Sequence, residues 1–194
     1  MEDLLQKLGV YNSEKLLKAF NIAKIAHEGT FRKSIKDKVE YIIHPLTVAL
    51  YVKEYKYSCN NIDICCAAIL HDVVEDTSIT LDEIEAMFGL TVREIVSEVT
   101  TIKDECKKIG KANYLLQKMV HMSNYSLVLK LADRLDNVND LFDFINFGTE
   151  KDKKFALKYI KETRFILDNL HIQRMLTETQ QNIFNRIMNK INFL

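Results

Sequence analysis

Apolar residues recur every three or four positions along most of this chain, which is the spacing of helices that bury one face. The pattern covers residues 13–26, 80–88, 91–102, 111–122, 126–145, 150–170 and 177–191. Three pairs match the capping box that begins many helices, namely Thr80 with Glu83, Thr91 with Glu94, and Thr177 with Gln180. Gly89 lies between two of these segments and suits a left-handed helix end. The pattern therefore predicts an all-α fold.

One predicted helix differs from the others because it lacks a polar face. The run from Ile64 to Leu70 is apolar on all sides, which is typical of a central, buried helix. Asn60 or Asn61 can cap its start, and the pattern carries it to about Glu75. The sequence therefore places this helix in the middle of the hydrophobic core.

The remaining segments are one helix and two irregular stretches. Pro45 fits the first turn of a helix that runs to about Tyr55, because the N–H that proline lacks would be unbonded there. Residues 28–43 show no sustained period and predict a long loop, which in a compact domain is often functional. Residues 103–110 read as a charged connector. The sequence predicts one globular domain over residues 1–194, built as an array of about eight to ten helices.

Composition and charge narrow the classes of function. The chain has 27 basic and 27 acidic residues, so it has no bulk field with which to hold nucleic acid or an anionic membrane. Five Gly and one Pro are too few for the turns of an all-β protein. The start, Met1 to Leu5, is acidic, and no apolar run approaches the ~18 residues of a membrane span. We therefore expect a cytoplasmic protein in which any phosphate site is local.

The four cysteines do not form a recognisable framework. They are Cys59, Cys65, Cys66 and Cys106, and they include no Cys-x-x-Cys pair. Neither a zinc ribbon nor a disulfide scaffold is indicated. We expect reduced and mostly buried thiols.

The most informative stretch is His71-Asp72-Val73-Val74-Glu75-Asp76, which ends the predicted central helix. Its carboxylates are three and four residues apart, so they crowd one side of a helix and repel one another. The residues one turn away supply no cation, and desolvating unpaired carboxylates costs several kcal/mol each. A divalent metal would offset this cost. Alternatively, the acids solvate the end of the helix, although they oppose its dipole there.

The segment from 126 to 145 carries two opposite stripes at helical spacing. One stripe is apolar and comprises Leu131, Leu135, Val138, Phe142 and Ile145, and the other is polar and comprises Ser126, Lys130, Asp133, Asn137 and Asp140. If the polar stripe is open to water, it is ordinary surface. If it faces the helix of His71 and Asp72, then Asp133 becomes a metal ligand and Asn137 an amide that orients it.

Arg32-Lys33-Ser34 places two cations in the predicted loop. Arginine forms planar, bidentate bonds to phosphate or stacks on a base, and lysine supplies a point charge. The same set also occurs on plain surfaces. His27, His121 and His171 have no comparable neighbours, and we interpret them as structural or solvent-facing.

The order of these residues resembles the HD hydrolase domain of RelA/SpoT-type alarmone enzymes. The matching segments are Ala26–Gly29, Arg32–Ser34, Tyr41–Pro45, Leu70–Thr77, and Lys130–Leu135 with Asn137. Phe88-Gly89, Val92 and Glu98-Val99-Thr100 also fall where the family has such residues. The resemblance spans nearly the whole chain and implies an all-α HD fold that binds one metal ion, usually Mn²⁺.

The resemblance also implies an activity, which is hydrolysis of the 3′-pyrophosphate of ppGpp or pppGpp to GDP or GTP plus pyrophosphate. The implied metal ligands are His44, His71, Asp72 and Asp133. Imidazoles mixed with carboxylates suit Mn²⁺ and would also accept Fe²⁺ or Zn²⁺. Glu75 and Asp76 match the acidic pair that handles the water and its protons, and Arg32, Lys33 and Asn137 match positions that hold the nucleotide. The expected partner is a guanosine polyphosphate, with no nucleic acid and no membrane.

Some positions depart from the family pattern. Asp136 stands where the family usually has His or an aromatic residue, and residues 34–40 are longer and more charged than the usual turn. These departures leave two alternatives open: an HD phosphohydrolase acting on another nucleotide, such as a phosphomonoester or NADPH, and a non-catalytic nucleotide sensor. Because 194 residues leave no space for a synthetase domain, we expect a small stand-alone hydrolase, similar in extent to the metazoan members, without synthesis of alarmone.

Overall fold

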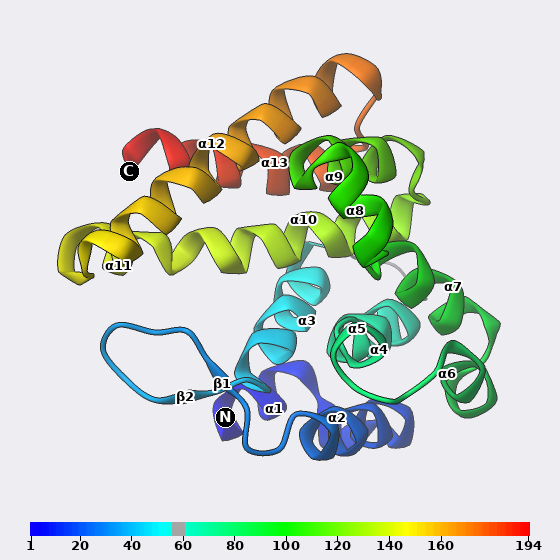
Figure 1. Cartoon of the computed structure of the whole chain (residues 1–194). Helices are drawn as coiled ribbons and strands as arrows, with labels where there is room; N and C mark the ends of the chain where they lie inside the picture. The colour runs from blue at the N-terminus through cyan, green and yellow to red at the C-terminus, as the bar shows by residue number, and fades with distance from the viewer. Residues whose placement is uncertain (56–60) are drawn as a thin grey trace. The chain divides into compact units, whose positions relative to one another are not determined.

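The computed structural model describes residues 1–55 and 61–194. Their contacts group them into two compact units. The first unit holds residues 1–32 and 39–100, and the second holds residues 33–38 and 101–194. Both units are built from helices (Figure 1), so the predicted all-α class is confirmed.

The first unit contains most of the residues singled out from the sequence. Its elements are α1 (Glu2–Leu8), a 3₁₀ helix (Val10–Asn12), α2 (Glu14–Ala26), β1 (Phe31–Arg32), β2 (Val39–Glu40), α3 (Ile43–Tyr55), α4 (Asn61–Leu70), α5 (Val73–Asp76), α6 (Leu81–Phe88) and α7 (Leu90–Val99). The two short strands pair antiparallel, with Arg32 opposite Val39. The predicted loop over residues 28–43 therefore contains a small hairpin.

The second unit is built around a long helix that carries Asp133. Its elements are α8 (Lys103–Ile109), α9 (Lys111–His121), α10 (Asn124–Asn139), α11 (Leu141–Phe147), α12 (Glu150–Gln173) and α13 (Glu178–Phe193). Helix α10 packs against α13, and α12 packs against α9 and α11. The prediction of a connector over residues 103–110 is wrong, because helix α8 forms there. The first turn of α8 carries Asp104 and Glu105, and its last turn carries Lys107 and Lys108. Acidic residues at the start and basic residues at the end of a helix interact favourably with its dipole.

Helix α4 is the centre of the first unit. It packs against α2, α3 and α7, and its residues from Ile64 to Leu70 are all buried. The predicted central, apolar helix is therefore confirmed. Of the two residues predicted to cap it, Asn60 lies outside the described residues and Asn61 is the first residue of the helix.

The central helix ends earlier than the sequence pattern predicted. Helix α4 stops at Leu70, and the separate short helix α5 starts at Val73. The Nδ1 atom of His71 lies 2.7 Å from the carbonyl oxygen of Ala68, the group that would accept the N–H of Asp72 in a continuous helix. The imidazole therefore competes with the helix backbone, and the chain turns at His71 and Asp72.

Helix α10 also ends early, and this changes the predicted core. The pattern predicted one helix over residues 126–145, but α10 stops at Asn139 and α11 follows Asp140. The break shifts the register of the apolar stripe, so that Phe144 is buried whereas Phe142, predicted in the core, is 44% exposed. On the opposite stripe Ser126 and Asp133 are buried, so that stripe is not ordinary open surface.

Thr80 caps α6 as the sequence predicted, and its removal has a measurable cost. Its hydroxyl accepts the N–H of Glu83, and the Glu83 carboxylate accepts the N–H of Thr80. We expect Thr80→Ala to lower the free energy of unfolding by about 1 kcal/mol, measured by urea denaturation.

Thr91 provides the matched control, because it does not cap a helix. Helix α7 begins at Leu90 directly after Gly89, whose φ of 87° and ψ of 169° turn the chain between α6 and α7. The predicted cap at Thr91 is therefore wrong. Gly89 has the positive φ of the predicted left-handed helix end, but its ψ is extended. Thr91→Ala should change the free energy of unfolding by less than about 0.5 kcal/mol. Equal losses for the two variants would contradict the assignment of the cap.

The structure also describes three of the four cysteines and the hydrophobic character of the helices. Cys65 and Cys66 are buried thiols, and burial raises the pKa of each to about 12. Cys106 is free and half-buried, and Cys59 lies outside the described residues. Among the helices that the structure describes, none has both the length and the apolar character needed to cross a membrane.

Candidate metal centre

Two imidazoles and one carboxylate meet in the first unit, at the turn after α4. The Oδ2 atom of Asp72 lies 3.1 Å from Nε2 of His71 and 3.8 Å from Nε2 of His44. The two imidazole rings are edge to face, with centroids 5.2 Å apart. Both histidines are buried. Three of the four predicted metal ligands therefore converge within one unit.

The hydrogen bond of His71 fixes which ring nitrogen carries the proton. A carbonyl oxygen only accepts hydrogen bonds, so Nδ1 of His71 must donate to Ala68. In a neutral imidazole the other nitrogen, Nε2, then presents a lone pair. That lone pair points at a carboxylate oxygen 3.1 Å away, so two acceptors face each other. A cation that binds both atoms removes this conflict, and it is the arrangement typical of a metal-ligating histidine.

His44 reaches the site from the start of α3. The helix begins at Ile43, two residues before the predicted start at Pro45, so His44 lies in its first turn. The backbone N–H of His44 donates to the carbonyl of Tyr41 at 2.9 Å. The site is therefore assembled from the start of α3 and the turn between α4 and α5, two segments that pack side by side because α3 and α4 are in contact.

Sequence reasoning missed two residues beside these ligands. The hydroxyl of Tyr41 donates to Oδ2 of Asp72 at 2.6 Å. The ring of Tyr41 packs on His27, with centroids 4.7 Å apart, and His27 is 95% buried. The prediction that His27 is structural fits its burial, but its position beside the site was not foreseen. The only available signal was that both residues occur in segments that carry the family resemblance.

The acidic pair follows the ligands directly on α5. The backbone N–H groups of Glu75 and Asp76 both donate to the carbonyl of Asp72. Glu75 is half-buried and Asp76 is exposed. The short helix therefore keeps both carboxylates within one turn of Asp72, as the sequence spacing required.

Asp133 and Asn137 lie together on α10 in the second unit. The Nδ2 atom of Asn137 donates to Oδ1 of Asp133 at 2.7 Å, and Nζ of Lys130 lies 2.9 Å from Oδ2. Both carboxylate oxygens of the buried Asp133 are thus held by neighbours on its own helix. Asn137 therefore has the geometry of an amide that orients the Asp133 carboxylate.

The two cations that the sequence placed together fall in different units. Arg32 ends β1 in the first unit. Lys33 belongs to the second unit, where Nζ lies 2.9 Å from Oδ1 of Asp152 and over the rings of two phenylalanines, Phe144 and Phe155. The pKa of Asp152 is lowered to about 2 by hydrogen bonds from Thr149 and from Lys33. The Lys33 ammonium therefore already has an anionic partner and an aromatic cage.

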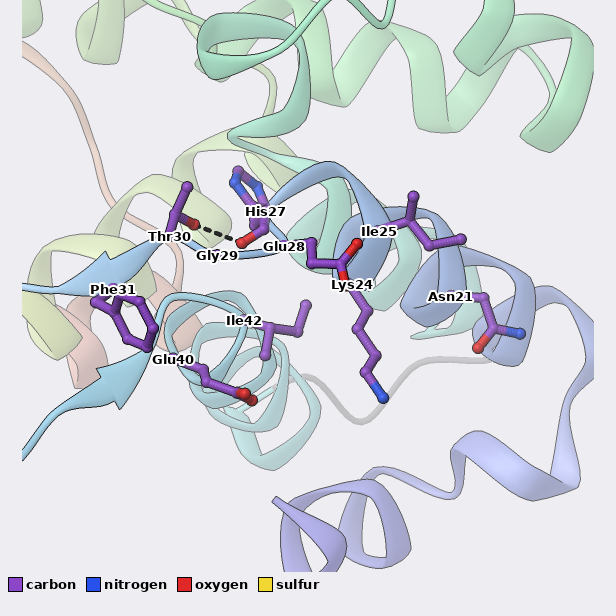
Figure 2. Close-up of a pocket in the computed structure, with 10 residues that line it drawn as sticks. All are labelled: Asn21, Lys24, Ile25, His27, Glu28, Gly29, Thr30, Phe31, Glu40 and Ile42. Atoms are coloured by element: carbon purple, nitrogen blue, oxygen red, sulfur yellow. Dashed lines mark hydrogen bonds between the residues drawn. The ribbon is translucent and has the colours of Figure 1, made fainter.

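A cavity of about 480 Å³ lies at the end of α2 in the first unit (Figure 2). Its polar lining comes from Asn21, Lys24, His27, Glu28, Thr30 and Glu40. The hydroxyl of Thr30 donates to the backbone carbonyl of His27 at 2.6 Å. Among the described residues that line this cavity, none is a predicted metal ligand or substrate-binding residue.

The donors in the first unit fit a divalent metal. They combine two imidazole nitrogens with a carboxylate, a mixed nitrogen and oxygen set that first-row divalent ions bind well. The conflict between Nε2 of His71 and Oδ2 of Asp72 is the observation that supports this fit.

The fold and this histidine-aspartate cluster define a class of protein. A profile of the HD domain family matches residues 19–158, and the chain belongs to that family. Divalent metal binding is a property of HD domains, and it agrees with the donors described above.

Proteins of known name resemble the chain over much of its length. A guanosine-3′,5′-bis(diphosphate) 3′-pyrophosphohydrolase of Aquifex aeolicus is 38% identical over 169 residues, which are 80% of this chain and 22% of that protein. The human protein named guanosine-3′,5′-bis(diphosphate) 3′-pyrophosphohydrolase MESH1 is 38% identical over 127 residues, which are 66% of this chain and 69% of MESH1. The chain thus spans about a fifth of the length of the bacterial relative.

A solved structure confirms the fold independently. A metazoan ortholog of SpoT, described as hydrolysing ppGpp and acting in starvation responses, aligns with a TM-score of 0.76 and 27% identity. The alignment covers 94% of this chain and 98% of that one. The predicted HD fold is therefore confirmed.

Proposed function

We propose that this chain is a metal-dependent hydrolase that removes the 3′-pyrophosphate of ppGpp or pppGpp, giving GDP or GTP and pyrophosphate. The observation that supports the proposal most directly is the cluster of His44, His71 and Asp72, in which Oδ2 of Asp72 lies 3.1 Å from Nε2 of His71 and 3.8 Å from Nε2 of His44. The names of the Aquifex and human relatives supply the substrate class. We also propose that residues 1–194 act as one HD hydrolase domain.

The proposed metal ligands are His44, His71 and Asp72, with Asp133 as the fourth. Two imidazoles and two carboxylates suit Mn²⁺, and they also suit Fe²⁺ or Zn²⁺. When bound, such an ion lowers the pKa of a water molecule and polarises a phosphoryl oxygen. The hydrogen bond from Asn137 and the ion pair with Lys130 restrict the Asp133 carboxylate to one orientation.

The other proposed roles belong to side chains that contact substrate or water. Glu75 and Asp76 are proposed to orient the attacking water and to take its proton. Arg32, Lys33 and Asn137 are proposed to hold the nucleotide and its phosphates. For Lys33 this role requires that a phosphate oxygen replace the carboxylate of Asp152, with which its ammonium is now paired.

A product assay tests the proposal. Purified protein with ppGpp and Mn²⁺ should release GDP and pyrophosphate in equal amounts, resolved by ion-exchange chromatography. Chelation of the metal should stop the reaction, and added Mn²⁺ should restore it. A metal-loaded protein that leaves ppGpp and pppGpp intact would reject the proposal, and tight binding of ppGpp without turnover would instead favour a nucleotide sensor.

One observation favours a second candidate function, that of an HD phosphohydrolase acting on another nucleotide. Asp136, which departs from the family pattern, is 92% buried and lies next to Asn137 on α10. An acid close to a polyphosphate disfavours a highly charged substrate unless its side chain points away. A panel of nucleotides, including NADPH and nucleoside monophosphates, distinguishes the candidates by product, because orthophosphate would support this candidate and pyrophosphate would oppose it.

A further inference from the structure

The hydroxyl of Tyr41 bonds to the one oxygen on which the metal centre of the first unit converges. It donates to Oδ2 of Asp72 at 2.6 Å. The same oxygen lies 3.1 Å from Nε2 of His71 and 3.8 Å from Nε2 of His44. A phenol hydroxyl is a donor to a carboxylate, and it occupies one lone pair while the oxygen keeps another for a cation. Tyr41 therefore fixes the Asp72 carboxylate in the orientation that faces both histidines.

The ring of Tyr41 is itself held from two sides. It packs on His27 with centroids 4.7 Å apart and planes 44° apart, and it meets the edge of His44 with centroids 5.8 Å apart. The Tyr41 backbone N–H donates to the carbonyl of Thr30, and its carbonyl accepts the N–H of His44. These contacts determine where the hydroxyl lies.

His27 supports Tyr41 by packing. It is 95% buried, and its Nε2 atom makes no hydrogen bond within the part of the chain that the structure describes. Burial lowers the pKa of His27, which favours the neutral form of the ring. A neutral ring without a bond at Nε2 contributes contact area to Tyr41 and no charge to the metal centre.

We propose that Tyr41 is a positioning residue of the metal centre, which holds the Asp72 carboxylate for metal binding, and that His27 acts through Tyr41. This inference rests on the proposed metal site. Hydrogen bonds to metal ligands typically change metal affinity by about 10- to 100-fold, because they fix the ligand before the ion arrives.

The test measures Mn²⁺ affinity directly, without nucleotide. Tyr41→Phe keeps the ring and removes only the hydroxyl, so it should weaken Mn²⁺ binding by about 10- to 100-fold in isothermal titration, with an unchanged circular dichroism spectrum. Tyr11→Phe is the matched control, because the Tyr11 hydroxyl also donates to a carboxylate, that of Glu2, but on the exposed surface of the same unit. Its Mn²⁺ affinity should equal that of the wild-type protein.

A second pair of variants tests the role of His27. His27→Ala should weaken Mn²⁺ binding less than Tyr41→Phe, and it should have no further effect when Tyr41 is already Phe, because its contribution passes through the hydroxyl. Additive losses would overturn the role of His27. If Tyr41→Phe does not fold, unchanged Mn²⁺ affinity in His27→Ala overturns the inference by itself.

Failure of this inference is distinguishable from failure of the proposed function. If the wild-type protein binds no divalent metal, both the proposed function and the role of Tyr41 are rejected. If the wild-type protein binds Mn²⁺ and the Tyr41→Phe variant binds it equally tightly, only the positioning role of Tyr41 is rejected.

Discussion

The Asp72→Asn variant is expected to lose Mn²⁺ binding in the micromolar range and to hydrolyse ppGpp at least about 10³-fold more slowly than the wild-type protein. Removal of one group that stabilises charge in a transition state typically costs 10²- to 10³-fold. This substitution also removes the anionic oxygen that meets His44, His71 and Tyr41. The amide of asparagine has nearly the same shape, so the loss reflects charge rather than packing.

The measurement compares the variant with another aspartate in the same unit. Asp63 on α4 pairs with Lys15, with Oδ1 and Nζ 2.5 Å apart, and it is half-buried as Asp72 is. Asp63→Asn should bind Mn²⁺ and turn over ppGpp as the wild-type protein does, measured by titration and by release of pyrophosphate. Hydrolysis at the wild-type rate by Asp72→Asn would show that this carboxylate is not a metal ligand.

The periodic parts of the fold could be predicted from the sequence because burial alone determines them. The apolar run of α4 requires neighbours on all sides, and α2, α3 and α7 provide them. The capping boxes at Thr80 and Thr177 are local, so three or four residues contain the whole signal.

The errors arise where a side chain or a distant contact overrides the local pattern. The sequence continues helical past His71, but its imidazole takes the Ala68 carbonyl and ends α4. The helix break at Asp140 likewise exposes Phe142, although its spacing places it on the apolar stripe. Hydrophobic periodicity indicates neither the hydrogen bond of His71 nor the helix break at Asp140.

In the candidate site too, local sequence patterns predicted some residues, whereas contacts between distant residues were missed. Local spacing predicted the neighbours His71, Asp72, Glu75 and Asp76. The polar stripe offered Asp133 as one of two alternatives, and the family resemblance supplied His44. Tyr41 was not predicted, because its bond to Asp72 joins residues 31 apart in the sequence. The partner of Lys33 was missed for the same reason, since Asp152 lies far along the chain and no pattern within the loop indicates it.

The carboxylate of Glu75 offers a way to separate metal binding from proton transfer. Glu75 is half-buried, and its backbone N–H bonds to the carbonyl of Asp72, so it lies one turn from the proposed ligands. If it takes the proton of the attacking water, Glu75→Gln should lower kcat by about 10²- to 10⁴-fold, because glutamine keeps nearly the same shape but cannot accept that proton. Mn²⁺ affinity should stay close to the wild-type value, since the ligand atoms are untouched.

Loss of kcat with unchanged Mn²⁺ affinity would assign Glu75 to proton transfer, and Glu85→Gln is the control variant. Glu85 lies on α6 in the same unit, where Oε2 is 3.6 Å from Nε of Arg93. Its substitution should change neither kcat nor Mn²⁺ affinity, measured by pyrophosphate release and titration. If Glu75→Gln loses Mn²⁺ binding together with activity, Glu75 belongs to the ligands rather than to the proton path. If it retains full kcat, the proton passes to another group, and the exposed Asp76 is then the next carboxylate to substitute.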